Sequence, residues 1–333
     1  MTAAVAVDLG KTGCRAVLLT DPHTPAGPAH EVPGAPGLAA AGGVEAARAA
    51  VRAAVLPLVA EHTPDRLAAV CVGAAGAASA PAAARALAEL LLTDLPADEA
   101  AVTSDAVTAH AGALGGRAGV VLAIGTGSVA VGIGADGSFA RVDGWGPWLG
   151  DEGSGAWIGV AGLRAALRAH DGRGPDTALL TAAATRFGDP DALPSALSAD
   201  GNPARTAASF APEVTRAAEA GDPVAAEIVR DAAAALGDSV LAAAARIPGD
   251  DLPVAVTGGL TGLGEPLVAP LRAALARSAR RLRPVAPLGD PLDGARLLAL
   301  DPSLPHEPHV VRVRRTAPPP RVPSAPVIPP AVA

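Results

Sequence analysis

The sequence predicts an α/β protein whose two domains face each other across a cleft. One observation is length, since 333 residues are enough for two hydrophobic cores. Another is a repeated unit: a strand, a glycine turn that carries a hydroxyl residue, and a second strand occur at 5–20 and again at 120–133. Strand-like segments also alternate with helix-like ones along the chain, which is typical of α/β folds.

The first domain is expected over residues 1–104 and begins with VAVDLGKTGCRAVLLT at 5–20. β-Branched and aliphatic residues flank the polar interruption, which predicts a hairpin whose Gly10 and Gly13 are free to take positive φ. The other elements expected here are a Pro/Gly-rich loop over 21–43, a helix near 44–61, a buried strand over 67–72, a helix near 81–92 and a short strand over 101–103.

The second domain is expected over residues 105–301, and its last helix, over 290–300, is expected to return to the first domain. Proline is so frequent from Pro302 onwards that residues 302–333 predict an extended, disordered tail. The other elements expected here are strands over 120–124 and 129–133, an Asp-Gly turn at 136–137, a helix ending at 170–172, two helices within 204–246 divided at 221–223, a strand over 253–257, a glycine turn at 258–259 and a helix over 265–282.

Charge and hydropathy exclude several classes of function. The net charge is −7 and no basic run is dense, so we expect no nucleic acid as a partner. The clustered arginines Arg312, Arg314 and Arg315 stand in the tail. No stretch of 18 residues is apolar throughout, which argues against a membrane span. The first residues lack the pattern of a signal peptide, so a cytoplasmic protein is expected.

Cysteine and histidine give no sign of a metal site. Cys14 and Cys71 provide neither a disulfide framework nor metal-ligand spacing. His306 and His309 flank Glu307, but a proline-rich tail has no rigid shell to orient them. The remaining histidine near a motif, at position 110, is expected on a helix face.

The two glycine turns are candidates for a phosphate site. Each leaves backbone N–H groups unpaired, and such groups bind anions. Two turns on opposite sides of a cleft would hold a polyphosphate from both sides, with Asp8 facing the phosphates through a cation such as Mg²⁺. Two ordinary hairpins are the alternative. GTGSVA at 125–130 also resembles a dinucleotide-binding fingerprint, but that pattern opens a helix, whereas here the alternation of valines continues as a strand.

Asp105 is a candidate catalytic residue because it follows a strand and begins a helix. Either it or Ser104 would be the N-cap of that helix. The alternative is a general base at the end of a strand, which points into the cleft and accepts the proton of a sugar hydroxyl during phosphoryl transfer.

The segment GWGPWLGDEGSG, residues 144–155, is a candidate sugar site. Trp145 and Trp148 place aromatic side chains outside a helix in a chain that has only three tryptophans. An apolar face beside a carboxylate suits a sugar, whose C–H groups stack and whose hydroxyls need acceptors. The alternative is that Asp151 and Glu152 only favour the dipole of the helix that follows.

These motifs, in this order, resemble those of the N-acetylglucosamine kinases and of the wider group of BadF/BadG/BcrA/BcrD-type ATPases, within the actin and hexokinase superfamily. The segments that carry the resemblance are VDLGKTGCRA, SDAVTAHAGA, VLAIGTGSVA, GWGPWLGDEGSG and VAVTGGLTGLGEPL. The resemblance implies two ribonuclease H-like (actin-like ATPase) domains. It also implies an ATP-dependent kinase that transfers the γ-phosphoryl group to the 6-hydroxyl of an amino sugar, with N-acetylglucosamine as the expected substrate. ATP, Mg²⁺ and a small-molecule sugar would be its ligands, and a homodimer is left open.

The same resemblance implies roles for individual residues. Asp8 would orient Mg²⁺ through water, and Asp105 would be the catalytic base in contact with the sugar. The residues implied for ATP are Gly10, Lys11, Thr12, Gly125, Thr126, Gly127, Ser128, Ala208, Gly258 and Gly259. The other residues implied for the sugar are Gly144, Trp145, Gly146 and Asp151.

Two departures from the family pattern keep an alternative open. The family usually has a glycine where Lys11 stands, and Lys11 would either add charge for a phosphate or only cover the turn. The loop VPGAPGLAAAGG lacks the family's Asn and has no polar side chain at all. A nucleotide-binding ATPase or regulator without sugar kinase activity is therefore the alternative. An iron–sulfur activator of a dehydratase is disfavoured, because Cys14 lies inside the glycine turn and Cys71 in an apolar strand.

Overall fold

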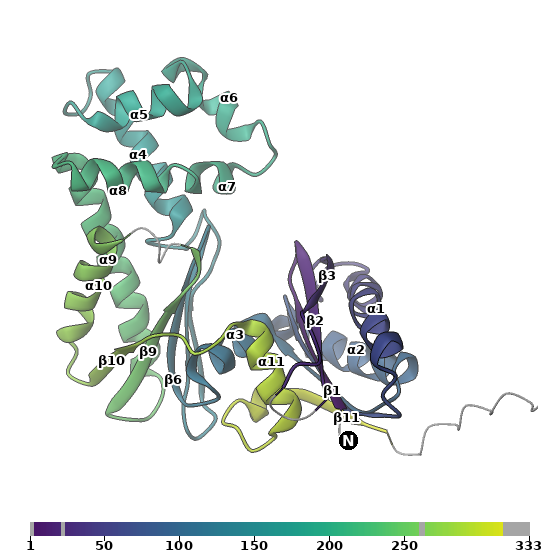
Figure 1. Cartoon of the computed structure of the whole chain (residues 1–333). Helices are drawn as coiled ribbons and strands as arrows, with labels where there is room; N and C mark the ends of the chain where they lie inside the picture. Colours follow the sequence, from purple (N-terminus) through teal and green to yellow (C-terminus); the bar gives the residue numbers. More distant parts are fainter. Residues whose placement is uncertain (1–2, 21–23, 260–263, 316–333) are drawn as a thin grey trace, which may run out of the picture.

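The computed structural model describes residues 3–20, 24–259 and 264–315, and contains two mixed β-sheets with helices packed on both (Figure 1). The N-terminal sheet has the strand order β11-β5-β4-β1-β2-β3, and the C-terminal sheet has the order β10-β9-β6-β7-β8. The strands are β1 (Ala3–Leu9), β2 (Gly13–Leu19), β3 (His30–Pro33), β4 (Leu67–Ala74), β5 (Ala97–Ser104), β6 (Gly119–Ile124), β7 (Ser128–Ile133), β8 (Phe139–Asp143), β9 (Asp251–Thr257), β10 (Arg281–Val285) and β11 (Val311–Arg314).

The two sheets share one topology, which explains the repeated sequence unit. In the N-terminal sheet, β1, β2 and β3 form an antiparallel meander, and β4 and β5 then continue in parallel on the other side of β1. In the C-terminal sheet, β6, β7 and β8 form the meander, and β9 and β10 continue in parallel beside β6. The predicted pair of α/β units is therefore confirmed. The boundary predicted between residues 104 and 105 stays a prediction.

Small residues on one face of the N-terminal sheet let two helices approach it closely. Val5 and Val7 of β1 belong to the core under α1 (Gly43–His62) and α2 (Pro81–Asp94), whereas Ala4 and Ala6 belong to the opposite core. That second core includes residues of α3 (Asp105–Leu114) and α11 (Pro291–Leu300). The predicted return of the last helix to the first sheet is thus observed, and α3 lies between the two sheets (Figure 1).

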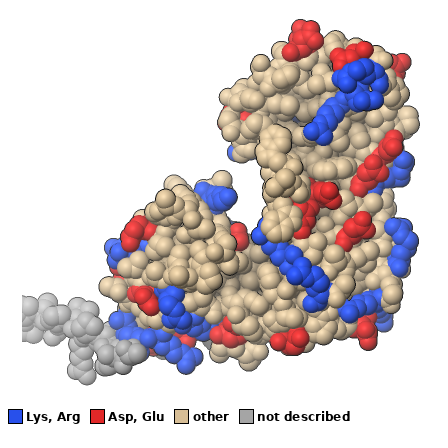
Figure 2. Space-filling view, turned by 180° about the vertical axis from the view of Figure 1, so that it is seen from behind, with Lys and Arg blue, Asp and Glu red and all other residues tan. Residues whose placement is uncertain are grey.

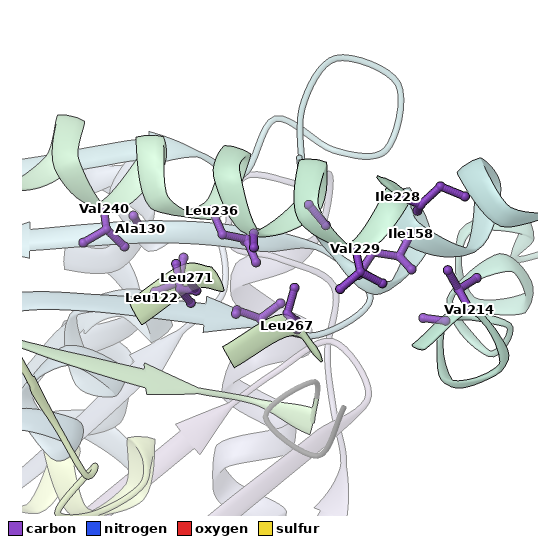
Figure 3. Close-up of a cluster of buried hydrophobic side chains, with 14 of the residues drawn as sticks. Leu122, Ala130, Ile158, Val214, Ile228, Val229, Leu236, Val240, Leu267 and Leu271 are labelled. Carbon is purple, nitrogen blue, oxygen red and sulfur yellow. The ribbon is translucent and has the colours of Figure 1, made fainter. Parts of the chain in front are cut away.

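The C-terminal sheet has the larger core, and its helices extend beyond the sheet. Leu122 of β6 packs with Leu236 and Val240 of α9 and with Leu271 of α10 (Figure 3). Helices α5 to α8 form a helical layer at the end of this half, above α9 in Figure 1. The helices of this half are α4 (Gly155–His170), α5 (Ala178–Phe187), α6 (Leu193–Ser198), α7 (Pro203–Ala208), α8 (Ala211–Glu219), α9 (Pro223–Ala245) and α10 (Glu265–Ala276).

Several predicted elements are corrected by the structure. The helix expected over 265–282 ends at Ala276, and its last residues belong to β10, which pairs in parallel with β9. The first of the two helices expected within 204–246 is divided into α7 and α8, while Asp222 caps α9 as predicted. The loop expected over 21–43 contains the edge strand β3. Among the described helices, none combines the length and apolar character needed to cross a membrane.

The segment after α11 is the largest correction, because residues 302–315 are ordered rather than an extended tail. β11 pairs in antiparallel fashion with β5, and Arg312 forms ion pairs with Glu99 at 2.7 Å and Glu307 at 2.6 Å. His306 is fully buried, and its Nε2 lies 2.9 Å from Nδ1 of His110, which is also buried. The clustered arginines are therefore structural, and the histidines do have a rigid shell. Residues 316–333 of the predicted tail lie outside the described residues.

Candidate active site

A cleft of about 540 Å³ lies between the two sheets, and its lining contains eight of the sixteen predicted site residues. Figure 2 shows the molecule hollowed between its two halves, with charged side chains on both sides of the hollow. The predicted site residues in its lining are Lys11, Asp105, Gly125, Gly127, Ser128, Gly144, Asp151 and Gly258. Residues of the lining that the sequence did not single out include Ala75, Gly76, Ser79, Phe139 and Arg141.

The first glycine turn joins β1 to β2 and is supported by the loop that follows β3. The Gly10 N–H donates to the carbonyl of Gly13 at 2.9 Å, and neither glycine has a positive φ, so the expectation of positive φ was wrong. The close approach is made by Gly34 instead, because a Cβ there would lie 2.4 Å from the Gly10 carbonyl oxygen. Lys11 and Thr12 stand exposed at the tip of the turn. The loop that follows β3 therefore packs closely against this turn and fixes its shape.

The second glycine turn joins β6 to β7 and is held from two sides. The Gly125 N–H donates to the carbonyl of Gly127 at 2.8 Å, and the first N–H groups of α4 donate to the carbonyls of Gly125 and Thr126. Gly258, with φ +99°, lies so close that a Cβ would be 2.3 Å from the Ile124 carbonyl oxygen. Glycine is required at 258 on both counts. Thr126 is exposed at the tip of the turn.

Asp8 lies at the end of β1 and is held by an arginine that the sequence analysis missed. Arg15, its partner in the β1–β2 ladder, donates to Asp8 at 2.8 Å and to Asp290 at 2.9 Å. Only the Oδ2 atom of Asp8 is used by Arg15, so Oδ1 remains for another ligand. Mg²⁺ usually keeps several waters and takes one or two carboxylates together with substrate phosphates, so a single half-free carboxylate fits that ion.

Asp105 lies in the cleft at the start of α3, and its neighbour Ser104 is the N-cap. The Ser104 hydroxyl oxygen accepts the Val107 N–H, which settles the choice of N-cap between the two residues. One oxygen of Asp105 accepts the Ala106 N–H at 2.9 Å. Burial, with the charge of Asp8 as a smaller cause, raises the pKa of Asp105. A carboxylate with a raised pKa at the wall of a cleft can accept a proton from a bound hydroxyl.

The loop between β8 and α4 carries Trp145, Trp148 and the cleft-lining carboxylate of Asp151. Gly144 and Gly146 have positive φ, and Gly144 lines the cleft. Trp145 remains 66% exposed, and the Arg141 guanidinium stacks 5.0 Å from the centre of its ring. Asp151 accepts the Gly146 N–H at 3.3 Å, and burial raises its pKa. An exposed aromatic face and a carboxylate are therefore available at one edge of the cleft.

Some predicted residues lie apart from the cleft lining. Ala208 ends α7 and packs near Gly159 of α4, and the cleft lining does not include it. Gly259 is exposed beside Gly258, and the following residues 260–263 lie outside the described part of the chain.

Neither cysteine offers a metal ligand. Burial raises the pKa of Cys14 and of Cys71 to about 12, so both are thiols at neutral pH. Among the described residues, no group of three or more His, Cys, Asp or Glu side chains could hold a metal ion.

Comparison with known proteins places the chain in a family. The sequence profile of the BadF/BadG/BcrA/BcrD ATPase family matches residues 5–299. The chain belongs to this family. An ATPase of this family binds ATP, and the cleft lined by the two glycine turns is its candidate nucleotide site.

Solved structures of similar proteins confirm the predicted actin-like fold of this ATPase. A Chromobacterium violaceum protein assigned as an N-acetylglucosamine kinase is 31% identical, with a TM-score of 0.68, over 90% of this chain and 99% of its own. A ROK-family glucokinase from Streptomyces griseus, solved with glucose and AMPPNP, has a TM-score of 0.52 at 18% identity over 89% of this chain and 99% of its own, and shows likeness of fold alone.

Curated relatives match shorter stretches of this ATPase. An N-acetylmuramic acid/N-acetylglucosamine kinase of Clostridium acetobutylicum is 32% identical over 116 residues, which are 34% of this chain and 37% of that protein. An N-acetyl-D-glucosamine kinase of Dictyostelium discoideum is 38% identical over 79 residues, 23% of this chain and 25% of that protein. Each match thus covers well under half of the relative.

Proposed function

We propose that the protein is an ATP-dependent kinase that transfers the γ-phosphoryl group of ATP to the 6-hydroxyl of an amino sugar, with N-acetylglucosamine as the expected substrate. The observation that carries the proposal is the position of Asp105, which shares one cleft with both glycine turns and with the carboxylate of Asp151. Sugar-kinase relatives at 31–38% identity support the same substrate class.

The two glycine turns would bind the phosphates of ATP. Backbone N–H groups at the tips of the two turns, near Lys11 and Thr126, would donate to phosphate oxygens from opposite sides. The Lys11 side chain lines the cleft and forms no ion pair with any described residue, so it can add a positive charge beside the phosphates. Asp8 would hold Mg²⁺ through water, and the bound ion would neutralise charge on the β- and γ-phosphates.

Asp105 would act as the general base. Its carboxylate would accept the proton of the sugar 6-hydroxyl while that oxygen forms a bond to the γ-phosphorus. The bond between the γ-phosphorus and the β,γ-bridging oxygen breaks, and ADP leaves with the electron pair. The raised pKa of Asp105 makes the carboxylate a better proton acceptor than an exposed aspartate.

A coupled ADP-release assay with a panel of hexoses and amino sugars tests this function. We expect strong turnover with an amino sugar and a fall in kcat of about 100-fold or more in Asp105→Asn, with little change in ATP affinity. Asp191→Asn is the matched control, because Asp191 is exposed between α5 and α6 and the cleft lining does not include it. Near-normal turnover of Asp105→Asn would remove Asp105 from the role of base.

The second candidate is a nucleotide-binding regulator without sugar kinase activity. The loop beside the first turn favours it, because its exposed side chains, among them Pro33, Pro36 and Ala39, offer no hydrogen bond to a sugar. ATP binding in the absence of turnover with any sugar in the panel would favour the regulator over the kinase.

A further inference from the structure

Asp143, the last residue of β8, has two unusual features that no motif singled out. Its φ is +61°, which makes it one of three non-glycine residues with positive φ in the described part of the chain; the others are Thr63 and Asp151. Its carboxylate also accepts two backbone N–H groups from the far end of the loop, Asp151 at 2.7 Å and Glu152 at 2.8 Å. Left-handed backbone at non-glycine residues is sparsely populated and is concentrated at functional sites.

These two hydrogen bonds hold the backbone of Asp151, whose side chain lines the cleft, and of Glu152 beside it. Asp151 in turn accepts the Gly146 N–H at 3.3 Å, and its Oδ2 lies against Gly127 of the second glycine turn, where a Cβ would be 2.5 Å away. The Asp143 carboxylate thus closes the loop from β8 to α4, and the Asp151 carboxylate packs between the start of that loop and the second glycine turn. The loop and the turn are therefore held as one unit through Asp143 and Asp151.

Two glycines provide the space that these carboxylates occupy. A Cβ on Gly150 would lie 2.2 Å from Oδ1 of Asp143, and a Cβ on Gly127 would lie 2.5 Å from Oδ2 of Asp151. Real Cβ atoms do not approach other atoms so closely, so an alanine at either position would displace the carboxylate beside it. The small residue beside each carboxylate thus agrees with the position that the carboxylate takes in the fold.

The start of α4 does not need Asp143. Ser154 is the N-cap of α4, and its hydroxyl oxygen accepts the Trp157 N–H. The Asp143 carboxylate instead bonds to residues before the helix, inside the loop. Asp143 is also absent from the cleft lining, so it does not contact a bound ligand there.

From this geometry we infer that Asp143 is a positioning residue for the sugar site: it holds the loop over residues 144–152 and aims the Asp151 carboxylate into the cleft. The inference rests on the proposed function, because the sugar is the ligand that Asp151 would contact. Loss of the Asp143 carboxylate frees two N–H groups and lets Asp151 turn, which weakens sugar binding more than ATP binding. A residue that only stabilised the fold would lower stability without this difference.

Two substitutions at position 143 separate the effect of the two hydrogen bonds of the Asp143 carboxylate from the effect of its positive φ. Glycine adopts φ +61° readily, so Asp143→Gly removes both hydrogen bonds without straining the chain. Asn keeps the size of Asp and one acceptor oxygen, so Asp143→Asn is the conservative variant. We expect the KM for the sugar to rise about tenfold in Asp143→Gly and about threefold in Asp143→Asn, with the KM for ATP within about twofold of the starting value.

Thr63→Gly is the matched control, because Thr63 has φ +41° at the end of α1 and lies outside the cleft. It should leave both KM values unchanged. An unchanged sugar KM in both Asp143 variants, or an equal rise of the two KM values, would overturn the inference.

A spectroscopic measurement tests the loop without turnover. Trp145 and Trp148 are two of the three tryptophans, so in a Trp157→Phe background the fluorescence anisotropy decay reports this loop directly. The fast component of the decay measures local motion of the tryptophans. We expect it to be smallest in the protein that keeps Asp143, larger in Asp143→Asn and largest in Asp143→Gly. An unchanged decay would overturn the inference. If the unaltered protein turns over no sugar, the proposed function fails, and the anisotropy alone decides whether Asp143 holds the loop.

Discussion

The contact between α3 and α11 offers a stringent test of how the base is positioned. The two helices cross where Gly112 faces Gly294, and a Cβ on Gly294 would lie 1.8 Å from the Thr108 carbonyl oxygen. Asp105 begins α3, and Asp290, which caps α11, is paired with Arg15 beside Asp8. The substitution Gly294→Ala therefore pushes apart two helices that both lead to the site.

The size of the effect follows from the overlap. Close carbon–oxygen contacts are about 3.3 Å, so the helices must separate by about 1.5 Å to accept the methyl group of Gly294→Ala. Overpacking against rigid backbone costs about 3 kcal/mol, and the better helix propensity of Ala offsets about 1 kcal/mol of that. A net loss of about 2 kcal/mol corresponds to a fall in Tm of about 3 °C if the 333 residues unfold together. A shift of about 1 Å at Asp105 would lower kcat by about tenfold or more.

Thermal unfolding and the sugar-dependent ADP-release assay measure the two effects of Gly294→Ala. The matched control is Gly237→Ala, where the new Cβ would lie 2.8 Å from the Cβ of Ala274 between α9 and α10. The control should lose stability but retain kcat, since neither helix carries Asp105. A Tm for Gly294→Ala equal to or above that of the unsubstituted protein would refute the close packing on which the reasoning depends.

Two further predictions concern the ordered segment after α11. Burial lowers the pKa of His110 to about 4 and that of His306 to about 3, from an ordinary value of 6.5, so between pH 6.5 and 4 the unfolded chain binds more protons than the folded one. The free energy of unfolding should therefore fall by about 1.4 kcal/mol per pH unit for each histidine as the pH drops through that window. Urea titrations at several pH values measure this free energy. A free energy of unfolding that does not change with pH would contradict the burial of the two histidines. Removing the largely buried Arg312 as Arg312→Met should cost about 3 kcal/mol, because Glu307 loses its partner and Glu99 keeps only the exposed Arg314. Equal urea midpoints for the variant and the parent would argue against a buried ion pair.

The glycine-turn units could be predicted from the sequence because their signals are local. Short runs of valine, leucine, isoleucine and alanine on either side of Gly10 and of Gly125 predict both the strands and the turn between them. The same holds for Asp222, whose side chain caps the helix that it begins. Each of these elements is specified within about ten residues.

Elements stabilised by distant partners could not be predicted in this way. β11 is rich in arginine and follows many prolines, and it becomes a strand because β5 offers an unpaired edge and Glu99 neutralises Arg312. The site shows the same limit. Gly34 and Asp143 lie outside the recognised motifs, and their roles depend on backbone atoms many residues away in the folded chain. An aspartate directly before the glycine of a GWG loop was the one available signal for Asp143.

The cleft itself indicates where selectivity for a sugar would have to come from. On the side of the N-terminal sheet, the Ser104 oxygen is used to cap α3 and the Ser79 hydroxyl donates to the Gly76 carbonyl. Lys11 and Asp105 are then the charged side chains that this side presents among the described lining residues, and each of the two serine hydroxyls already makes one internal hydrogen bond. A site that makes fewer hydrogen bonds to a substrate rejects its analogues less strongly. Under the proposed kinase reaction, discrimination among hexoses would therefore depend on the opposite wall, where Asp151 is held in place by the carboxylate of Asp143.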